Sequence, residues 1–175
     1  PCQPIAVRNV IGYLVGVQRD MTAMVASEEA LKASLEHERL AYAFAGVGTF
    51  EWDIRGGLVT HSETNLKLLG FTPDQRSSPY ALIRNRVHVD DRAMFDDAVR
   101  LCLAGHTGLD LEYRVVWDNG QARWLHTRGD VKLDAAGLPK DMHGLSQDIT
   151  ERKEIEERVR YTALHDILTG LPNRT

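Results

Sequence analysis

The sequence predicts an α+β domain in which short helices cover one face of a five-stranded antiparallel sheet, with a long linker helix on either side. The clearest strand signal lies at 109–117, where apolar and polar side chains alternate strictly. The turn Asp118-Asn119-Gly120 joins that strand to a longer one at 122–134. The clearest helix signal is the apolar face between Asp90 and Leu103. Two strands, several short helices and three more strands, in that order, fit a single sheet of this kind.

The other elements of the domain follow from local signals. Alternation over 47–54 and 58–61, around a Gly-Gly turn, predicts a hairpin. Ser62 is expected to cap a helix over 63–69. Residues 72–79 are rich in Pro, Ser and Asp and are expected to form a loop. The remaining expectations are helix ends at Gly70 and Gly105, a turn over 136–139 and a last strand over 140–147.

A repeat sets the domain boundaries. The pattern Gly-x-x-x-Asp-x-Thr at 16–22 recurs at 144–150, each time after an apolar stretch and before a charged run. We therefore expect two related modules in tandem. In this interpretation residues 1–20 are the C-terminal strand of a preceding module, and 46–150 is the complete one. The two charged runs, 21–45 and 151–165, are the linker helices.

The second linker helix has a readable start. Asp148 and Glu151 have the spacing of a capping box, in which Asp148 would accept the amide hydrogen of Glu151, and Thr150 is a competing cap. Ile155 and Val159 form a thin apolar seam among charges. In the first linker, Leu31, Leu35 and Tyr42 form a similar seam. Each helix either covers its own domain or pairs with a second copy in a parallel coiled coil; we favour the coiled coil.

Composition excludes several classes of protein. The 175 residues are 43% hydrophobic and 26% charged, with a net charge of −4 and a pI near 6.0. Such a chain has no basic surface for nucleic acid, and we predict no nucleic-acid partner. No apolar run approaches the length of a membrane helix, so we predict no membrane segment here and a cytoplasmic location. Two cysteines, Cys2 and Cys102, are too few for a disulfide framework.

Four ordered motifs resemble one branch of the PAS family. They are Gly48–Asp53 (G-x-[WF]-x-W-D), His88–Arg92 (H-x-D-D-R), Trp117–Trp124 (W-x-x-x-G-x-x-R-W) and Asp148–Thr150 (D-I-T). Val89 stands where the family usually has Pro. The resemblance implies the PAS fold, a five-stranded antiparallel sheet around a small ligand pocket.

No residue of this domain points to a cofactor or a metal. His88 is expected to fix the turn into the long helix rather than to bind haem. His126 is expected to be an ordinary residue on a sheet face, and Cys102 a buried thiol on the apolar side of its helix. The three tryptophans are interpreted as core or interface anchors. We therefore predict an empty pocket, or one filled adventitiously.

The last residues resemble the opening of a GGDEF diguanylate cyclase domain. Residues 165–174 read HDILTGLPNR, which fits the pattern D-x-L-T-G-L-x-N-R. The matching residues are Asp166, Leu168, Thr169, Gly170, Leu171, Asn173 and Arg174. The resemblance implies a downstream GGDEF domain that joins two GTP molecules across a dimer. No catalytic residue is predicted in this chain, so it is not itself expected to be an enzyme.

The start of the chain resembles the last strand of a LOV domain, the flavin-binding branch of the PAS family. Residues 13–20 read YLVGVQRD, and Gln18 matches the glutamine that faces the flavin. An amide can both donate and accept, so it could follow a change at a flavin nitrogen. The alternative is an ordinary Gln on a PAS strand. FMN is expected upstream only if the preceding domain is a LOV domain.

Together these observations predict a sensory and signal-transmission module that regulates a cyclic di-GMP-synthesising cyclase through a dimeric helical linker. The predicted transmission residues are Asp20, Thr22, Asp148, Thr150, Glu151, Ile155 and Val159. One alternative is a non-sensing PAS scaffold that only spaces and dimerises its neighbours. The other is the sensor region of another PAS-controlled enzyme, such as a histidine kinase. The parent protein could also carry a phosphodiesterase domain.

Overall fold

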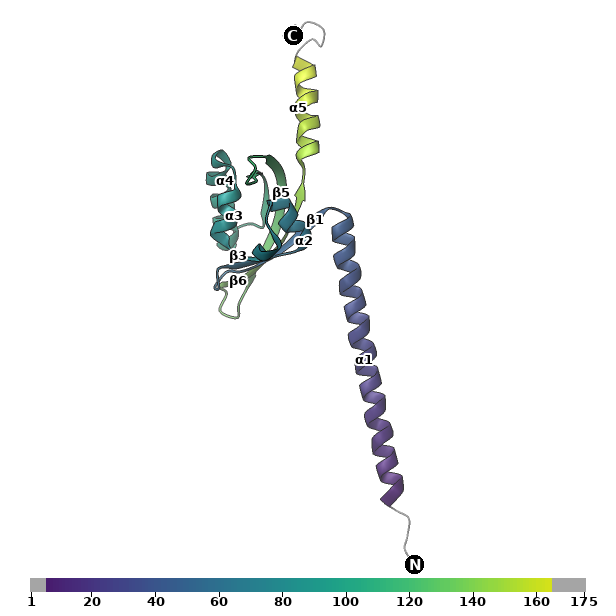
Figure 1. The fold of residues 1–175 in the computed structure, drawn as a ribbon. Coiled ribbons are helices and arrows are strands. Elements are labelled where there is room, and N and C mark those ends of the chain that lie inside the picture. Colours follow the sequence, from purple (N-terminus) through teal and green to yellow (C-terminus); the bar gives the residue numbers. More distant parts are fainter. Residues whose placement is uncertain (1–5, 165–175) are drawn as a thin grey trace, which may run out of the picture. The chain divides into compact units, whose positions relative to one another are not determined.

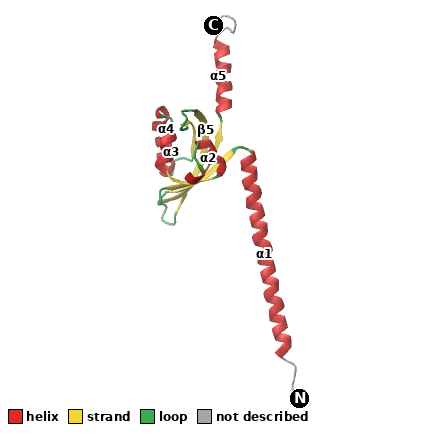
Figure 2. Ribbon diagram, viewed as in Figure 1, coloured by secondary structure: helices red, strands yellow, loops and turns green. Residues whose placement is uncertain are grey.

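The computed structural model describes the fold of residues 6–164, with side chains from Met24 onward (Figures 1 and 2). The elements are α1 (Ala6–Phe44), β1 (Val47–Asp53), β2 (Leu58–His61), α2 (Glu63–Leu69), a 3₁₀ turn (Pro73–Gln75), β3 (Ser77–Pro79), α3 (Tyr80–Arg86), a second 3₁₀ turn (Val89–Asp91), α4 (Arg92–Leu103), β4 (Leu109–Val116), β5 (Ala122–Leu133), β6 (Pro139–Asp148) and α5 (Thr150–Leu164). The chain divides after Ala41 into two units, which are described separately.

The sheet is antiparallel throughout, with the strand order β3-β2-β1-β6-β5-β4. It therefore has six strands in the described chain, where the sequence predicted five. The additional strand, β3, lies in the segment expected to be a loop and pairs Ser78 with Val59 at the sheet edge. Pro79 is tolerated there because an edge strand has one side free of ladder hydrogen bonds. The short helix α3 that follows was also not predicted.

The other predicted elements are present, and their boundaries have visible physical causes. The Ser62 hydroxyl accepts the amide hydrogens of Asn65, at 3.2 Å, and of Thr49, at 2.9 Å, so it starts α2 and fastens that start to β1. Gly70 ends α2 with φ of 67°, a left-handed conformation that suits glycine. The turn at Gly120 also has positive φ, 81°, as the Asp-Asn-Gly signal predicted.

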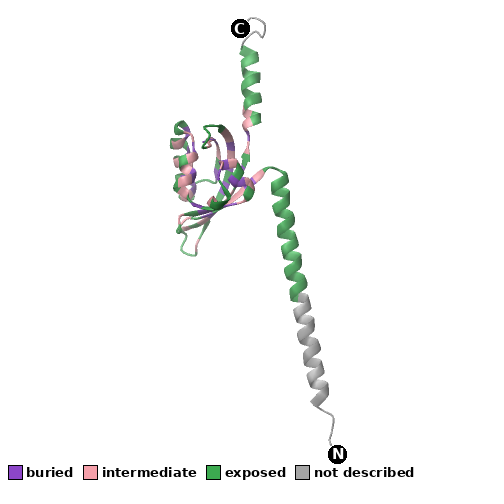
Figure 3. Cartoon of the chain, in the orientation of Figure 1, coloured by how far each residue is buried: buried purple, intermediate pink, exposed green. Residues whose placement is uncertain are grey.

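One face of the sheet packs against α2, α3 and α4 and forms the core (Figure 3). Leu125 on β5 and Met142 on β6 are fully buried at its centre. The opposite face carries polar side chains, such as Glu51 on β1 and Arg128 on β5, both exposed. The central strands therefore bury one face only, which is the usual origin of the alternating pattern in an antiparallel sheet.

The strand predicted over residues 1–20 is wrong for the described part of that range. Residues 6–20 form the first half of α1, a helix of 39 residues. A strand needs a neighbouring strand to pair its amides, whereas a helix satisfies its own backbone, and residues 6–44 contain no proline. The pattern Gly-x-x-x-Asp-x-Thr thus lies in a helix at 16–22 and spans the junction of β6 and α5 at 144–150.

The flavin-facing role of Gln18 was predicted for a strand, whereas the backbone at this position is helical. Gln18, Asp20 and Thr22 all lie on α1. Their proposed roles remain predictions. From Met24 to Phe44 the described side chains of α1 are exposed, including those of Leu31 and Leu35. No helix in the described part of the chain has the length and apolar character that crossing a membrane requires.

Candidate functional site: an interior cavity and the start of the C-terminal helix

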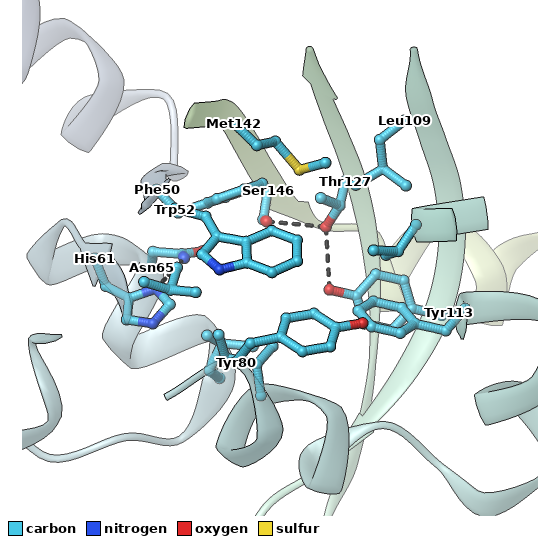
Figure 4. A pocket seen from close by; sticks show the side chains of 15 residues that line it. Phe50, Trp52, His61, Asn65, Tyr80, Leu109, Tyr113, Thr127, Met142 and Ser146 are labelled. Atoms are coloured by element: carbon cyan, nitrogen blue, oxygen red, sulfur yellow. Dashed lines mark hydrogen bonds between the residues drawn. The ribbon is translucent and has the colours of Figure 1, made fainter. Parts of the chain in front are cut away.

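A cavity of about 40 Å³ lies between the sheet and the helices (Figure 4). Its walls come from β1, β2, α2, α3, α4, β4, β5 and β6, and they include Trp52, His61, Asn65, Tyr113 and Ser146. No charged residue is among those that line it. One buried water occupies at least roughly 10–15 Å³, so the cavity has room for water or another small molecule. The described side chains therefore fill most of the interior.

A chain of three hydroxyl groups crosses one wall of the cavity. The Tyr113 hydroxyl lies 3.2 Å from Thr127 Oγ1, which in turn lies 2.9 Å from Ser146 Oγ. The chain connects β4, β5 and β6: Thr127 and Ser146 are direct partners in the register of β5 and β6, whereas Tyr113 reaches Thr127 diagonally because its own partner on β5 is Leu125 (Figure 4). All three residues are buried, and burial raises the pKa of the Tyr113 hydroxyl. The hydroxyls are therefore neutral and satisfy one another.

A second polar chain lies on the wall formed by β2 and α2. The Asn65 amide nitrogen lies 2.9 Å from His61 Nδ1, and His61 Nε2 lies 3.3 Å from Ser78 Oγ. His61 is only 2% exposed, and burial lowers its pKa from 6.5 to about 4. The imidazole is therefore neutral near pH 7, with Nδ1 as acceptor and Nε2 carrying the hydrogen in this arrangement.

Two polar atoms at the cavity have no hydrogen-bond partner among the described residues: Trp52 Nε1 and Asn65 Oδ1. Trp52 is held in place by its ring, which stacks on Tyr80 with centroids 4.5 Å apart and planes 7° from parallel. Burial also raises the pKa of Tyr80 to about 12, so this ring stays a neutral phenol. The sequence identified Trp52 as a core or interface anchor but gave no sign of this unpaired donor.

The H-x-D-D-R motif builds the turn into α4. His88 Nδ1 accepts the Asp90 amide hydrogen at 3.3 Å, which confirms the predicted role of His88 in the turn. Asp91, 8% exposed, accepts three hydrogen bonds from Arg114 on β4: from the backbone amide at 2.8 Å, Nε at 2.9 Å and Nη2 at 2.6 Å. Those contacts hold the pKa of Asp91 below its usual range. The motif therefore fixes α4 on the sheet.

The other predicted structural residues lie where the sequence placed them. Cys102 is buried, at 2% exposure. His126 lies on the polar face of the sheet, with Nε2 2.6 Å from Asp110 Oδ1. Trp117 donates from Nε1 to the Leu68 carbonyl at 3.0 Å, anchoring α2. Among the side chains that the structure describes, from Met24 to Leu164, no three His, Cys, Asp or Glu gather as metal ligands would.

The start of α5 is tied to β5 by main-chain and side-chain bonds. Asp148 Oδ1 accepts the Thr150 amide hydrogen at 2.8 Å, and Thr150 Oγ1 accepts the Trp124 amide hydrogen at 2.9 Å. The Ile149 amide donates to the Trp124 carbonyl, also at 2.9 Å. Asp148 was expected to accept the amide hydrogen of Glu151, but it accepts that of Thr150 instead. The reason is that the first helical hydrogen bond of α5 runs from the Lys153 amide to the Ile149 carbonyl. Glu151 is exposed.

Two basic residues of the first turn of α5 converge on Glu112 of β4. Lys153 Nζ lies 2.7 Å from Glu112 Oε2, and Arg152 Nη2 lies 2.5 Å from Glu112 Oε1. The Lys153 ammonium also lies 5.3 Å from the centre of the Trp124 ring. Hydrogen bonds from Lys153 and then Arg152 lower the pKa of Glu112 from 4.5 to about 2. We call Glu112, Arg152 and Lys153 the helix clamp; the sequence did not predict it.

Beyond the clamp, α5 leaves its apolar side chains uncovered. Ile155 is 51% exposed and Val159 61% exposed. The helix therefore does not cover its own domain at these positions. Of the two explanations given for the seam, pairing with a second copy is the one that remains a prediction. The GGDEF-like residues, Asp166, Leu168, Thr169, Gly170, Leu171, Asn173 and Arg174, lie outside the described residues.

Comparison with known proteins agrees with this fold. Residues 58–146 match the PAS fold family (PAS_3). The sensor protein FixL of Bradyrhizobium diazoefficiens is 32% identical over 140 residues, which are 79% of this chain and 28% of FixL. A blue-light-activated histidine kinase of Brucella ovis is 30% identical over 112 residues, 64% of this chain and 22% of the kinase. The chain thus spans about a quarter of the length of these curated relatives.

Solved structures give the same result. A sensory box histidine kinase/response regulator from Burkholderia thailandensis superimposes with a TM-score of 0.62 at 30% identity, covering 70% of this chain and 92% of that one. The N-terminal domain of a diguanylate cyclase with PAS/PAC sensor from Marinobacter aquaeolei gives 0.56 at 16% identity, covering 61% and 98%, a likeness of fold alone. The match over 58–146, the six-stranded sheet and the helices on one face place this chain in the PAS-fold family.

Proposed function

We propose that this chain is a sensory and signal-transmission module of a diguanylate cyclase, which it regulates through a dimeric helical linker. The observation that carries the proposal is the sequence HDILTGLPNR at 165–174, which follows α5 directly and resembles the opening of a GGDEF domain. A module of this kind works in the cytoplasm, where GTP is available. The catalytic residues belong to the downstream domain.

The contacts at α5 support transmission from the PAS domain into the linker. The helix start is bonded to β5 through Trp124 and to β4 through Glu112, so a change in sheet geometry moves the first turn of α5. The exposed Ile155 and Val159 then offer a seam for a second copy. Because a cyclase must bring together two GTP-loaded domains, a change in the angle or register of that seam would control the reaction.

A histidine kinase is the second candidate output. The observation that favours it is the similarity to a blue-light-activated histidine kinase and to a sensory box histidine kinase/response regulator, each 30% identical. The same PAS module and clamp would serve either output, since both use dimeric helical linkers. The discriminating feature is the chemistry of the domain that α5 leads into.

An assay of the full-length protein separates the two outputs. Purified protein is incubated with GTP and Mg²⁺, and cyclic di-GMP is measured by mass spectrometry; a parallel sample receives labelled ATP. Formation of cyclic di-GMP supports the proposal, whereas phosphorylation of the protein by ATP with no cyclic di-GMP overturns it in favour of the kinase.

A pair of variants tests whether α5 transmits. In Glu112→Gln the clamp loses its charge, and in Glu154→Gln the same change is made on α5 at an exposed position outside the clamp. We expect the first to alter the output rate by several-fold and the second to leave it unchanged. Equal rates in both variants would support the alternative of a passive spacer. A visible spectrum of the same full-length protein tests for FMN upstream.

A further inference from the structure

Trp117, the residue that follows β4, is fastened to the end of α2. Its indole Nε1 donates to the Leu68 carbonyl at 3.0 Å. Its ring also lies against Gly70, the residue that ends α2, where an added Cβ would be 2.6 Å from the indole Cδ1. The same helix contributes Asn65 and Leu69 to the wall of the cavity. A hydrogen bond and a close packing contact thus connect this ring to a helix of the cavity wall.

The Trp117 ring also holds the guanidinium group of Arg123, on β5. The central carbon of that group lies 5.1 Å from the centre of the ring, where the ring quadrupole attracts a cation. Arg123 Nε is buried and has no hydrogen-bond partner among the described residues. Nη1 of the same group donates to Asp148 Oδ2 at 3.3 Å. The guanidinium is therefore positioned by the aromatic ring and the carboxylate together.

Asp148 completes the connection to α5. Its Oδ2 accepts from Arg123, while its Oδ1 accepts the amide hydrogen of Thr150, the first residue of α5, at 2.8 Å. The side chains of Arg123 and Asp148 are 33% and 32% exposed, so water and salt screen this ion pair only in part. One continuous set of contacts thus runs from the end of α2, through Trp117, to the start of α5.

We propose that Trp117 is a positioning residue that couples the end of α2 to the start of α5. A displacement of α2 moves the indole through the Leu68 carbonyl, and the indole in turn moves Arg123 relative to Asp148. The helix clamp and the bonds of Trp124 join α5 to the sheet, whereas this connection joins α5 to a helix that covers the sheet. The inference rests on the proposed function only for the statement that α5 carries a signal.

Hydrogen exchange of the ¹⁵N-labelled 175-residue chain tests the coupling from the α5 side. Asp148→Asn removes the charge that attracts Arg123 but keeps an oxygen for the Thr150 amide. We expect the Trp117 indole N–H to exchange about two- to tenfold faster, which corresponds to the loss of part or all of one hydrogen bond. The indole of Trp52, which stacks on another ring, should keep its rate.

The opposite direction is tested with Trp117→Phe, which removes the indole donor and keeps an aromatic ring beside Arg123. The Phe71 amide, which donates to the Leu66 carbonyl at the end of α2, should exchange faster, as it would if Trp117 only stabilised α2. A coupling role also requires the Thr150 amide to exchange faster, again by about two- to tenfold. That second effect distinguishes positioning from local stabilisation.

Glu154→Gln is the matched control for Asp148→Asn. Glu154 lines the same surface pocket as Arg123 and Asp148, and the change again replaces a carboxylate by an amide. It should leave the indole and amide exchange rates unchanged. Arg123→Met is the second variant if Asp148→Asn does not fold. It removes the middle contact and should also make the Trp117 indole exchange faster.

Three results would overturn the coupling. They are an unchanged Trp117 indole rate in Asp148→Asn or Arg123→Met, an effect of Trp117→Phe confined to α2, and equal acceleration in Glu154→Gln, which would be an effect of net charge. None of them bears on the assay for cyclic di-GMP. Conversely, a full-length protein that makes no cyclic di-GMP would remove the proposed output and leave the exchange results as they are.

Discussion

Lys153, in the first turn of α5, places its ammonium group 2.7 Å from the Glu112 carboxylate on β4. The bond joins β4 to α5, although two strands, β5 and β6, lie between them in the sequence. It orients a helix whose later turns are exposed. Glu112→Gln should therefore raise the hydrogen-exchange rate of the first-turn amides of α5 several-fold. Because the pair is partly exposed, the free energy of unfolding should fall by less than about 1 kcal/mol. Glu154→Gln is the matched control; if it accelerates exchange equally, the clamp has no specific role.

The Asp91–Arg114 pair is expected to contribute much more to stability. Asp91→Ala removes three hydrogen bonds and leaves the Arg114 backbone amide unpaired, so urea titration should show a loss of about 2–4 kcal/mol. Asp90→Ala is the control: this neighbouring carboxylate is exposed and reaches Arg114 only at 3.5 Å. Its loss should be below about 0.5 kcal/mol. Similar losses in both variants would contradict the importance assigned to Asp91.

His61 should make the stability of the PAS domain depend on pH. Its pKa is about 4 in the folded chain, against 6.5 for an unperturbed imidazole, so between those values the unfolded chain binds a proton that the folded chain does not. The contribution is fully present above pH 6.5 and is lost as the pH falls toward 4. From pH 7 to pH 5 the free energy of unfolding should fall by about 2 kcal/mol through this group. His61→Gln should remove that part of the pH dependence of the free energy of unfolding. An unchanged pH dependence would show that the imidazole is accessible to protons.

Gly48 is required by a close approach between β1 and α2. A Cβ at this position would lie within 2.6–2.7 Å of the backbone of Asn65, which cannot move without displacing α2. Gly48→Ala should therefore lower the melting temperature strongly, in line with the roughly 1–3 kcal/mol typical of overpacking. Gly108→Ala is the comparison, because its nearest neighbour is the flexible carboxylate of Asp130 at 2.9 Å. Equal melting temperatures for the two variants would refute the argument.

The seam on α5 predicts the state of association. Replacing both Ile155 and Val159 by Glu puts charges into the proposed helix pair, so the dimer of the full-length protein should dissociate in analytical ultracentrifugation, and the output should be lost. Arg158→Glu, which changes a charge on the same helix outside the seam, should leave the dimer intact. If output and stimulus response both survive the double replacement, the coiled-coil mechanism is wrong.

Local signals were sufficient for most of the PAS domain. Alternation, the Asp-Asn-Gly turn and Ser62 each act within a few residues, and each gave the correct element. The elements that were missed have weak local signals: β3 has three residues and one of them is proline. The strand predicted over residues 1–20 failed for a different reason, since a repeated sequence pattern does not by itself decide between strand and helix, which depends on tertiary context.

The site was predictable only in outline. The turn role of His88 and the burial of Cys102 follow from neighbouring residues, and the structure confirms them. The partner of Lys153 is 41 residues away in the chain, and the cavity brings Trp52 and Asn65 together from different elements. Those contacts depend on sheet register and helix packing, which no short window of sequence contains.

β6 lies between β1 and β5, contributes Ser146 to the cavity wall and ends at Asp148, two residues before α5 begins at Thr150. Sliding a central strand by one residue would turn Met142 and Ser146 out of the core and bring His143 and Leu145 into it. β6 therefore cannot act as a piston. What it can pass to α5 is a change of twist, because neighbouring strands rotate against one another without breaking their ladder. We therefore predict that a signal passed from this domain to α5 would be a rotation of the helix and not a translation along it.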